Sequence, residues 1–199
     1  MDLNYANYET RQGVQPITWE DFHALCRGLA LAASKFDPQV VLGIARGGLY
    51  VGVLLSHLLQ KDFYAIYLSR RHLDQKVSEQ PRWLVRPPDL VQGLRVLVVD
   101  EICSSGETLR MAKAELVRLG VNEVRCAVLY AHSWGIETPD YIGLVSDALL
   151  VNPWDHEIAK NGSIVYSPEY AYALNLQNIP PESVLGKYPA GIYRPIKEP

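Results

Sequence analysis

Two neighbouring carboxylates at the end of a mainly apolar run are the residues best suited to chemistry in this sequence. Asp100 and Glu101 follow the run 94–99, and a stretch of mostly small and polar residues, 102–108, comes after them. Paired carboxylates suit sugar hydroxyls or a divalent metal that bridges to phosphate. The backbone N–H groups of a turn that opens a helix suit a phosphate. The hydroxyl side chains that could add to these donors are Ser104, Ser105 and Thr108.

The elements around these residues place them where open α/β sheets bind their ligands. Residues 94–99 have the composition of a buried strand, and an apolar face at helical spacing then runs from Leu109 to Leu119 and stops at Gly120. Ligands of such sheets lie beyond the carboxyl ends of the strands. The spacing of the turn is neither that of a Walker A loop nor that of Gly-x-Gly-x-x-Gly, so the common nucleotide motifs are excluded.

Strands and helices alternate along much of the chain. Thr18, as N-cap with Asp21 three residues later, marks the start of the first helix, which Asp37 and Pro38 end. Strands are expected at 40–44, 63–68, 94–99 and 124–130, and helices at 19–36, 49–59 and 109–119. This alternation predicts an α/β fold with a doubly wound, mainly parallel sheet flanked by helices.

The polar stretch 69–93 interrupts the alternation. It carries many charged side chains and the pair Pro87-Pro88, without a periodic apolar face. A segment of this length inside a compact domain is either a mobile lid or binding loop, or a solvated surface excursion.

The composition of the chain excludes several classes of protein. The chain has 199 residues, 48% of them hydrophobic, which excludes disorder and, at about 150 residues per domain, gives one domain and a surplus. A net charge of -3 gives little support for a nucleic-acid partner. No apolar run approaches the roughly 18 residues of a membrane span, and three cysteines without a Cys-x-x-Cys pair favour a reducing cytoplasm. The composition changes near the C-terminus, because residues 166–199 hold five of the 12 tyrosines and six of the 13 prolines.

Three motifs resemble those of the type I phosphoribosyltransferases. The segment 96–109, with Asp100-Glu101 and a Ser-Gly-Glu-Thr loop, looks like the family's signature for phosphoribosyl pyrophosphate (PRPP). Residues 43–49 resemble its pyrophosphate loop, and residues 147–155 resemble the base-binding end of the xanthine-guanine enzymes. Because the motifs occur in the family's order, the chain is identified as similar to type I phosphoribosyltransferases, and most of all to the xanthine-guanine (6-oxopurine) enzymes.

The resemblance implies a role for each motif. Asp100 and Glu101 would hold the ribose hydroxyls and, with Ser104, form the catalytic set. The residues that would bind PRPP are Arg46, Gly47, Gly48, Asp100, Glu101, Ser104, Ser105, Gly106, Glu107 and Thr108. The residues that would contact the base are His132, Leu149 and Leu150.

The resemblance also implies Mg²⁺ as cofactor, carried mostly by PRPP and water, with Asp100 and Glu101 as indirect ligands. The stretch 69–93 would be the lid, with Arg70 and Lys76 as candidate contacts to PRPP. A further implication is a non-proline cis peptide bond between residues 45 and 46.

At the level of domains, the resemblance implies a type I phosphoribosyltransferase core with a small hood over residues 1–155. Residues 156–199 would form a C-terminal extension packed on the core or on a partner subunit. A homodimer is the family expectation.

Three positions depart from the family pattern, all among the residues that would contact the base. Ser104 stands where 6-oxopurine enzymes carry an aspartate that exchanges a proton with N7, and a serine hydroxyl is no comparable acid–base group. Leu149 stands where the xanthine-guanine enzymes stack a tryptophan, and His132 where they place a lysine. Leu149 can still pack on a ring, and His132 can donate to an oxygen. Alternatively, Ser104 is only a turn residue and His132 a satisfied histidine at a strand end.

Two functions are therefore expected. The first is a Mg²⁺-dependent transferase that moves the 5-phosphoribosyl group from PRPP to a nitrogenous base, with a purine such as xanthine, guanine or hypoxanthine as acceptor. The alternative is a PRPP- or nucleotide-sensing regulator of the same fold with lost or weak transfer. Ser104 and Leu149 favour the regulator, whereas the intact Arg46-Gly47-Gly48 loop favours the enzyme.

Overall fold

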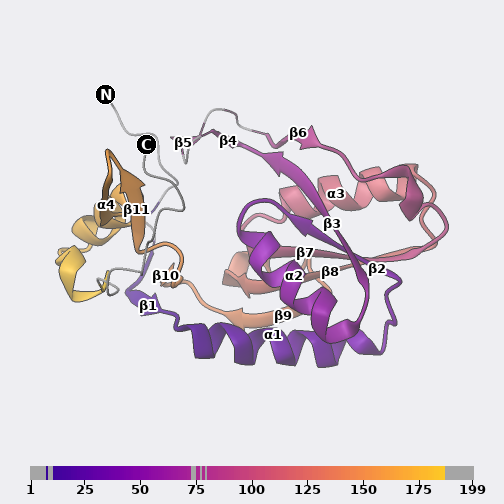
Figure 1. Ribbon diagram of the computed structural model, residues 1–199, viewed down its shortest axis with the longest axis horizontal. Helices are drawn as coiled ribbons and strands as arrows, with labels where there is room; N and C mark the ends of the chain where they lie inside the picture. The colour runs from indigo at the N-terminus through magenta and orange to yellow at the C-terminus, as the bar shows by residue number, and fades with distance from the viewer. Residues whose placement is uncertain (1–7, 9–10, 73–74, 77, 79, 187–199) are drawn as a thin grey trace, which may run out of the picture.

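A six-stranded sheet forms the centre of the protein (Figure 1). The structure is a computed structural model that describes residues 8, 11–72, 75–76, 78 and 80–186. The sheet has the order β6-β3-β2-β7-β8-β9, and all neighbours are parallel except β6 and β3. The strands are β2 (Val40–Ile44), β3 (Asp62–Ser69), β6 (Arg82–Val85), β7 (Arg95–Cys103), β8 (Glu123–Ala131) and β9 (Tyr141–Val145). This arrangement confirms the predicted α/β fold with a doubly wound, mainly parallel sheet.

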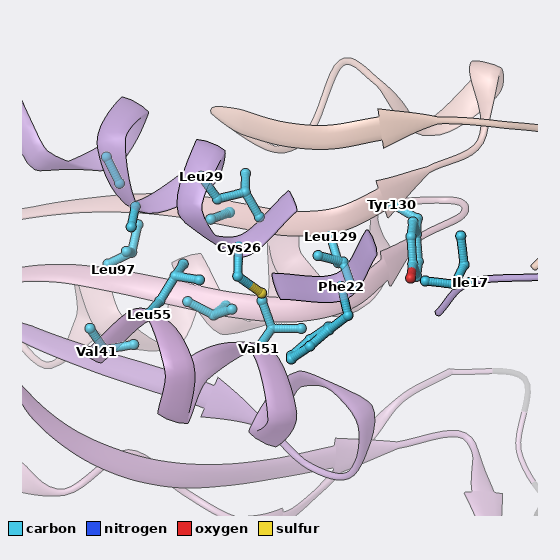
Figure 2. Packing of buried hydrophobic residues seen from close by; sticks show 14 of the residues in the cluster. Ile17, Phe22, Cys26, Leu29, Val41, Val51, Leu55, Leu97, Leu129 and Tyr130 are labelled. Atoms are coloured by element: carbon cyan, nitrogen blue, oxygen red, sulfur yellow. The ribbon is translucent and has the colours of Figure 1, made fainter. Parts of the chain in front are cut away.

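Helices cover both faces of the sheet. The helices that cover the sheet are α1 (Trp19–Ser34), α2 (Gly47–Leu59) and α3 (Glu107–Arg118). Helices α1 and α2 pack on one face, where Cys26 and Leu55 meet Leu97 of β7 (Figure 2), and α3 packs on the other. Because the central strands are buried on both faces, their sequences are almost continuously apolar. The predicted capping box of Thr18 and Asp21 is present.

The bounds of several elements differ from the prediction. Helix α1 ends at Ser34, before the predicted end at residue 36, and α2 begins at Gly47, two residues earlier than expected. Strand β7 continues to Cys103, because its pairing with β8 extends to the Cys103–Ala131 register. The two acidic residues therefore lie within the strand near its carboxyl end, and the turn begins after them.

The stretch 69–93 is partly an edge of the sheet. It contains the short strands β4 (Arg71–His72) and β5 (Gln75–Lys76), the strand β6 and a 3-10 turn, η1 (Asp89–Val91). The Nη1 atom of Arg86 lies 2.6 Å from Oε1 of Glu115 in α3, which ties this edge to the helix layer. Strand β6 pairs with β3, Trp83 is partly buried and the next two residues are exposed, so this part is an ordered edge strand on the surface, and a lid role for it stays a prediction. The remainder of the predicted lid includes 73–74, 77 and 79, which lie outside the described residues.

A smaller group of strands and helices lies at one end of the central sheet, where α4 and β11 are near β10 and β1 (Figure 1). Its elements are β1 (Val14–Pro16), η2 (Ser133–Gly135), β10 (Leu149–Val151), β11 (Glu157–Lys160), β12 (Ser163–Tyr166), α4 (Pro168–Leu176) and η3 (Pro181–Ser183). Strands β1 and β10 pair in parallel, and β11 and β12 form a hairpin. We call the buried apolar residues of this group the hood cluster, made of Tyr8, Leu149, Val151, Ala173, Leu174 and Leu185.

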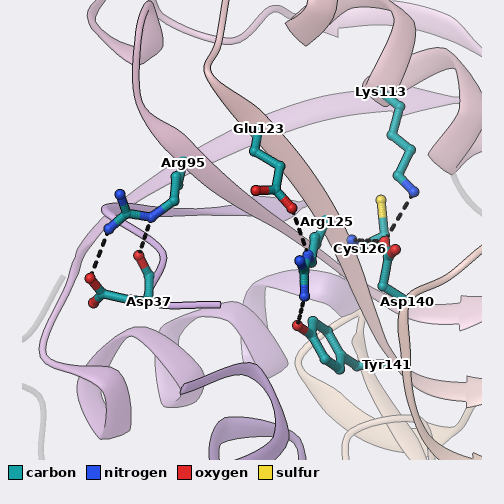
Figure 3. A network of polar contacts seen from close by, with 8 residues as sticks. All are labelled: Asp37, Arg95, Lys113, Glu123, Arg125, Cys126, Asp140 and Tyr141. Atoms are coloured by element: carbon teal, nitrogen blue, oxygen red, sulfur yellow. Dashed lines mark hydrogen bonds and ion pairs between the residues drawn. The ribbon is translucent and has the colours of Figure 1, made fainter. Parts of the chain in front are cut away.

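Polar contacts fix the loops at the opposite, amino end of the sheet (Figure 3). Asp37 accepts from Arg95 at 2.7 Å, and Asp140 accepts from the backbone N–H of Cys126 at 2.7 Å and from Lys113 at 3.0 Å. The amino ends of the strands are therefore closed by side chains, and the carboxyl ends are left for a ligand. No helix in the described part of the chain is both long and apolar enough to span a membrane.

Replacing Glu115 by glutamine should lower the free energy of unfolding near neutral pH. Hydrogen bonds from Arg118, and in second place from Arg86, lower the pKa of the Glu115 carboxyl from 4.5 to about 2. A depressed acid pKa stabilises the fold above the ordinary value, and this stabilisation is lost as the pH falls towards the folded-state pKa.

Urea unfolding of wild type and Glu115→Gln from about pH 7 to about pH 3 measures the effect. The stability difference should narrow with acid, while the exposed control Glu182→Gln should stay close to wild type throughout. A difference that does not change with pH contradicts the role of the Glu115 charge.

Candidate active site

The loop that joins β2 to α2 lies against the end of β7. A Cβ atom at Gly48 would lie 2.8 Å from the carbonyl oxygen of Val99, and a Cβ atom at Gly47 would overlap the carboxylate of Glu101. Gly48 therefore requires glycine, because the backbone of β7 leaves no room for a side chain, whereas any side chain at Gly47 would displace the carboxylate of Glu101. This close approach brings two of the predicted motifs, the pyrophosphate loop and the acidic pair, to one place.

Arg46 stands at the start of the same helix. The Ala45–Arg46 peptide bond is cis, as the resemblance implies. The Arg46 side chain is exposed and helps to line a hollow with Leu49 and Tyr50 of α2. A guanidinium group carries a permanent charge on a forked set of donors, which suits a pyrophosphate.

The two carboxylates of β7 have different surroundings. Asp100 accepts the N–H of Glu101 at 2.8 Å, and burial raises the pKa of its carboxyl to about 7. Glu101 accepts a hydrogen bond from the side-chain amide of Asn152, which the sequence analysis did not single out. A carboxyl group with a pKa near neutrality is readily ionised by an approaching cation or hydroxyl donor.

The loop between β7 and α3 is shaped for an anion. Gly106 takes φ 75 and is the N-cap of α3, so its conformation suits glycine and the helix starts with backbone N–H groups. Arg110 supports the loop from behind by donating to the carbonyl of Ser105 at 2.8 Å and to Thr138 at 3.0 Å. Oε2 of Glu107 lies 3.6 Å from Nη1 of Arg70, so these two predicted PRPP contacts pair with each other.

The side chain of Lys76, the other candidate contact in the predicted lid, lies outside the described residues. The remaining loop residues, Ser104, Ser105 and Thr108, are at least partly exposed. They lie around the start of α3, and their contact with a phosphate stays a prediction.

His132 presents an acceptor to its surroundings. Its Nδ1 lies 2.7 Å from the carbonyl oxygen of Ser146, which can only accept, so Nδ1 carries the proton. Burial lowers the pKa of the ring, which keeps it neutral, and Nε2 is buried without a hydrogen-bond partner in the described part of the chain. Nε2 can therefore only accept a hydrogen bond, and it is enclosed by the protein, so His132 does not present the donor that was expected for an oxygen of the base.

An aromatic side chain absent from the predicted set lies beside His132. The ring of Trp134 stacks on the imidazole with centroids 4.7 Å apart, and its Nε1 donates to Oγ of Ser104 at 3.4 Å. Trp134 is 52% exposed next to the loop that begins at Ser104, although the guanidinium of Arg11 also lies over its ring, 5.4 Å from the centroid. Its place two residues after His132 is the only signal in the sequence that could have pointed to it.

The two leucines predicted to contact a base are buried. Leu149 is 2% exposed and belongs to the hood cluster, and Leu150 is 6% exposed and packs in the core below α1. Neither side chain offers an open face to a ring. Trp154 packs as expected, stacked on Tyr50 with centroids 4.3 Å apart.

A metal ion at this site would take most of its coordination from a bound phosphate compound and from water. Within the described ranges, no group of three or more His, Cys, Asp or Glu side chains could hold a metal ion. Asp100 and Glu101 are adjacent carboxylates, the ligand type that Mg²⁺ prefers. The two carboxylates therefore fit an ion whose other ligands are phosphate oxygens and water molecules.

The chain belongs to the family of the phosphoribosyl transferase domain, whose model matches residues 18–160. This agrees with the resemblance found in the three motifs, and with the sheet and the phosphate-type loop of the structure.

Individual relatives are more varied. The chain is 30% identical, over 149 residues, to a xanthine-guanine phosphoribosyltransferase of Cereibacter sphaeroides, with 70% of this chain and 85% of that protein covered. It is 28% identical over 96 residues to the transcriptional regulator GfcR of Thermoplasma acidophilum, which covers 48% of this chain and 45% of that protein. The structure is similar to that of a purine phosphoribosyltransferase from Pyrococcus horikoshii, with a TM-score of 0.66, 26% identity, and 75% and 99% of the two chains covered.

Replacing Gly47 by alanine should weaken PRPP binding, because the added methyl group displaces the Glu101 carboxylate. We expect the dissociation constant for PRPP with Mg²⁺, measured by titration calorimetry, to rise by about tenfold, the size of one lost hydrogen bond to a charged group. The matched control is Gly28→Ala in α1, where a Cβ atom meets nothing within 4 Å. That variant should bind as wild type and gain up to about 1 kcal/mol of helix stability. Wild-type binding by Gly47→Ala would contradict the placement of Glu101 in the site.

Proposed function

We propose that this protein transfers the 5-phosphoribosyl group from PRPP to a nitrogenous base and releases pyrophosphate. The observation that carries the proposal is the contact of Gly47 and Gly48 with the end of β7, which joins a basic loop to a carboxylate pair. The family of the chain supports the same reaction class.

Each residue of the site has a task in this reaction. The backbone of the loop from Ser104 to Thr108 holds the 5′-phosphate at the start of α3, and Asp100 and Glu101 hold the ribose hydroxyls. Arg46 and the amides of Gly47 and Gly48 hold the pyrophosphate. The ring nitrogen of the base attacks C1 of the ribose, the bond to pyrophosphate breaks, and the base loses one proton. The chain works by positioning the reactants and by stabilising charge.

We propose Mg²⁺ as the cofactor. The ion neutralises the leaving pyrophosphate when bound. Asp100 and Glu101 would contact it indirectly, through PRPP or water.

The proposed acceptor is a purine such as xanthine, guanine or hypoxanthine. Similarity to a xanthine-guanine enzyme and to a purine enzyme supports this class. The partly exposed ring of Trp134, close to Ser104, would be the contact surface for a base, and the buried imidazole of His132 would support it from behind. Leu149 and Leu150 would act through packing, because both are buried.

A regulatory protein is the second candidate. The similarity to the transcriptional regulator GfcR favours it, together with Ser104 in place of an acidic residue. Such a protein would bind PRPP or a nucleotide at the same loop without efficient transfer.

We also propose a cytoplasmic homodimer without a nucleic-acid or membrane partner. The three cysteines are buried free thiols, as suits a reducing compartment. The hollow beside Arg46 is lined mainly by apolar side chains, among them exposed Val53 of α2, and a second subunit would cover it. Sedimentation equilibrium should give twice the 22.3 kDa of one chain, and Val53→Arg should shift the mass towards one chain. A monomeric wild type would contradict the dimer.

Pyrophosphate release tests the transferase. The purified protein is incubated with PRPP, Mg²⁺ and each of a panel of purine and pyrimidine bases. We expect release with at least one 6-oxopurine, because the site residues and the family agree on PRPP chemistry. If PRPP binds tightly and no base supports release, the regulator is the correct function.

The same assay includes Ser104→Asp, with Ser104→Ala as the matched control. A carboxylate at this position can take a proton from the purine, which a serine hydroxyl cannot. Purine turnover should rise by about tenfold or more in Ser104→Asp and should not rise in Ser104→Ala. Equal turnover in all three proteins would remove residue 104 from base activation.

A further inference from the structure

One buried amide connects the acidic pair to the C-terminal part of the chain. The side chain of Asn152 is 2% exposed, and its Nδ2 donates both to Oε1 of Glu101 and to Oδ2 of Asp155, the latter at 2.9 Å. Its Oδ1 accepts from the hydroxyl of Tyr130 at 2.8 Å. Since carboxylates only accept, the orientation of the amide is fixed by its partners, and no polar atom of the side chain is left unused.

The amide separates two carboxylates that would otherwise repel each other. Burial raises the pKa of Asp155 because it disfavours the charged carboxylate, and the hydrogen bond from Asn152 acts in the opposite direction. The two N–H groups of the Asn152 amide donate one hydrogen bond to each carboxylate. An aspartate or an apolar residue at position 152 has no such N–H donors.

The network continues into the extension. The hydroxyl of Tyr170 in α4 hydrogen-bonds to Asp155, and the hydroxyl of Tyr8 donates to Glu169 of the same helix. Helix α4 packs through the hood cluster on Leu149 and Val151, which precede Asn152 in the chain. The segment that carries Asn152 is therefore held between the sheet and α4.

Glu101 is confined from two sides. The Gly47 backbone meets Oε2 of its carboxylate, and Asn152 holds Oε1. A long acidic side chain that faces a ligand loses considerable rotamer freedom on binding unless it is already fixed. Asn152 supplies that fixation before PRPP arrives.

We propose that Asn152 is a positioning residue for PRPP, which orients Glu101 towards the ribose, and that Tyr170 of α4 completes the site by holding Asp155. The inference rests on the proposed PRPP chemistry and adds to it a residue outside the PRPP motifs and a contribution from residues beyond 155.

The test compares Asn152→Leu and Asn152→Asp with wild type. Both variants keep the size of the side chain and remove its donors. The dissociation constant for PRPP with Mg²⁺ and the KM for PRPP should each rise about tenfold to a hundredfold, as expected for a lost hydrogen bond to a charged group. The KM for the base should stay within about twofold, because the base does not contact Glu101. A general loss of structure would instead change both KM values and the melting temperature.

Tyr170→Phe is the second test variant, which is used if the Asn152 variants do not fold. It removes only the hydroxyl group and keeps the packing of the ring. It should raise the PRPP dissociation constant by about threefold to tenfold, the range of a typical lost hydrogen bond. Its matched control is Tyr141→Phe, which removes a hydrogen bond to Arg125 at the other end of the sheet and should leave binding unchanged.

The outcomes separate the two proposals. If wild type does not bind PRPP, the proposed function fails and the inference falls with it. If wild type binds PRPP but folded Asn152→Leu or Tyr170→Phe binds equally well, the function stands and the corresponding positioning role is overturned.

Discussion

The close approach of two backbones at the end of β7 is the constraint on which the site depends. Gly47 and Gly48 leave no room for a side chain between the first turn of α2 and the strand that carries Asp100 and Glu101. The approach is possible because β2 and β7 are neighbours in the sheet and the loop after β2 is very short. Strand pairing thus brings the loop and the two carboxylates together, and the hydrogen bond from Asn152 holds the side chain of Glu101 there.

The sheet separates stability from chemistry. Ion pairs and hydrogen bonds of Asp37 and Asp140 close the amino ends of the strands, far from the acidic pair. At the carboxyl ends the buried groups are less completely compensated: Asp100 has a raised pKa, and Nε2 of His132 is a buried acceptor without a partner in the described residues. Such concentrations of uncompensated polar groups are typical of sites that a ligand completes.

The sequence predicted what depends on local patterns. Apolar runs predicted the buried strands, and the Thr18–Asp21 pair predicted the start of α1. The resemblance to the phosphoribosyltransferases implied that the residues around 46 and 100 serve one ligand, and the structure brings them together. Features set by distant contacts could not be predicted in this way. Strand β6 has no apolar periodicity because it lies at the edge of the sheet, where Trp83 is partly buried and both Leu84 and Val85 are exposed. The tautomer of His132 depends on the carbonyl of Ser146, and the role of Asn152 depends on Glu101, a residue in another strand.

The pairing of β1 with β10 has a consequence for how the protein folds. This parallel pair joins residues 14–16 to residues 149–151, whereas β2 and β3, and likewise β7 and β8, are joined through a single helix. Contacts between distant residues carry a larger loop-closure entropy and form late. On a ribosome, the sheet can therefore assemble while the hood cluster still waits for α4 to emerge. The newly made protein would acquire its fold before it acquires a complete ligand site.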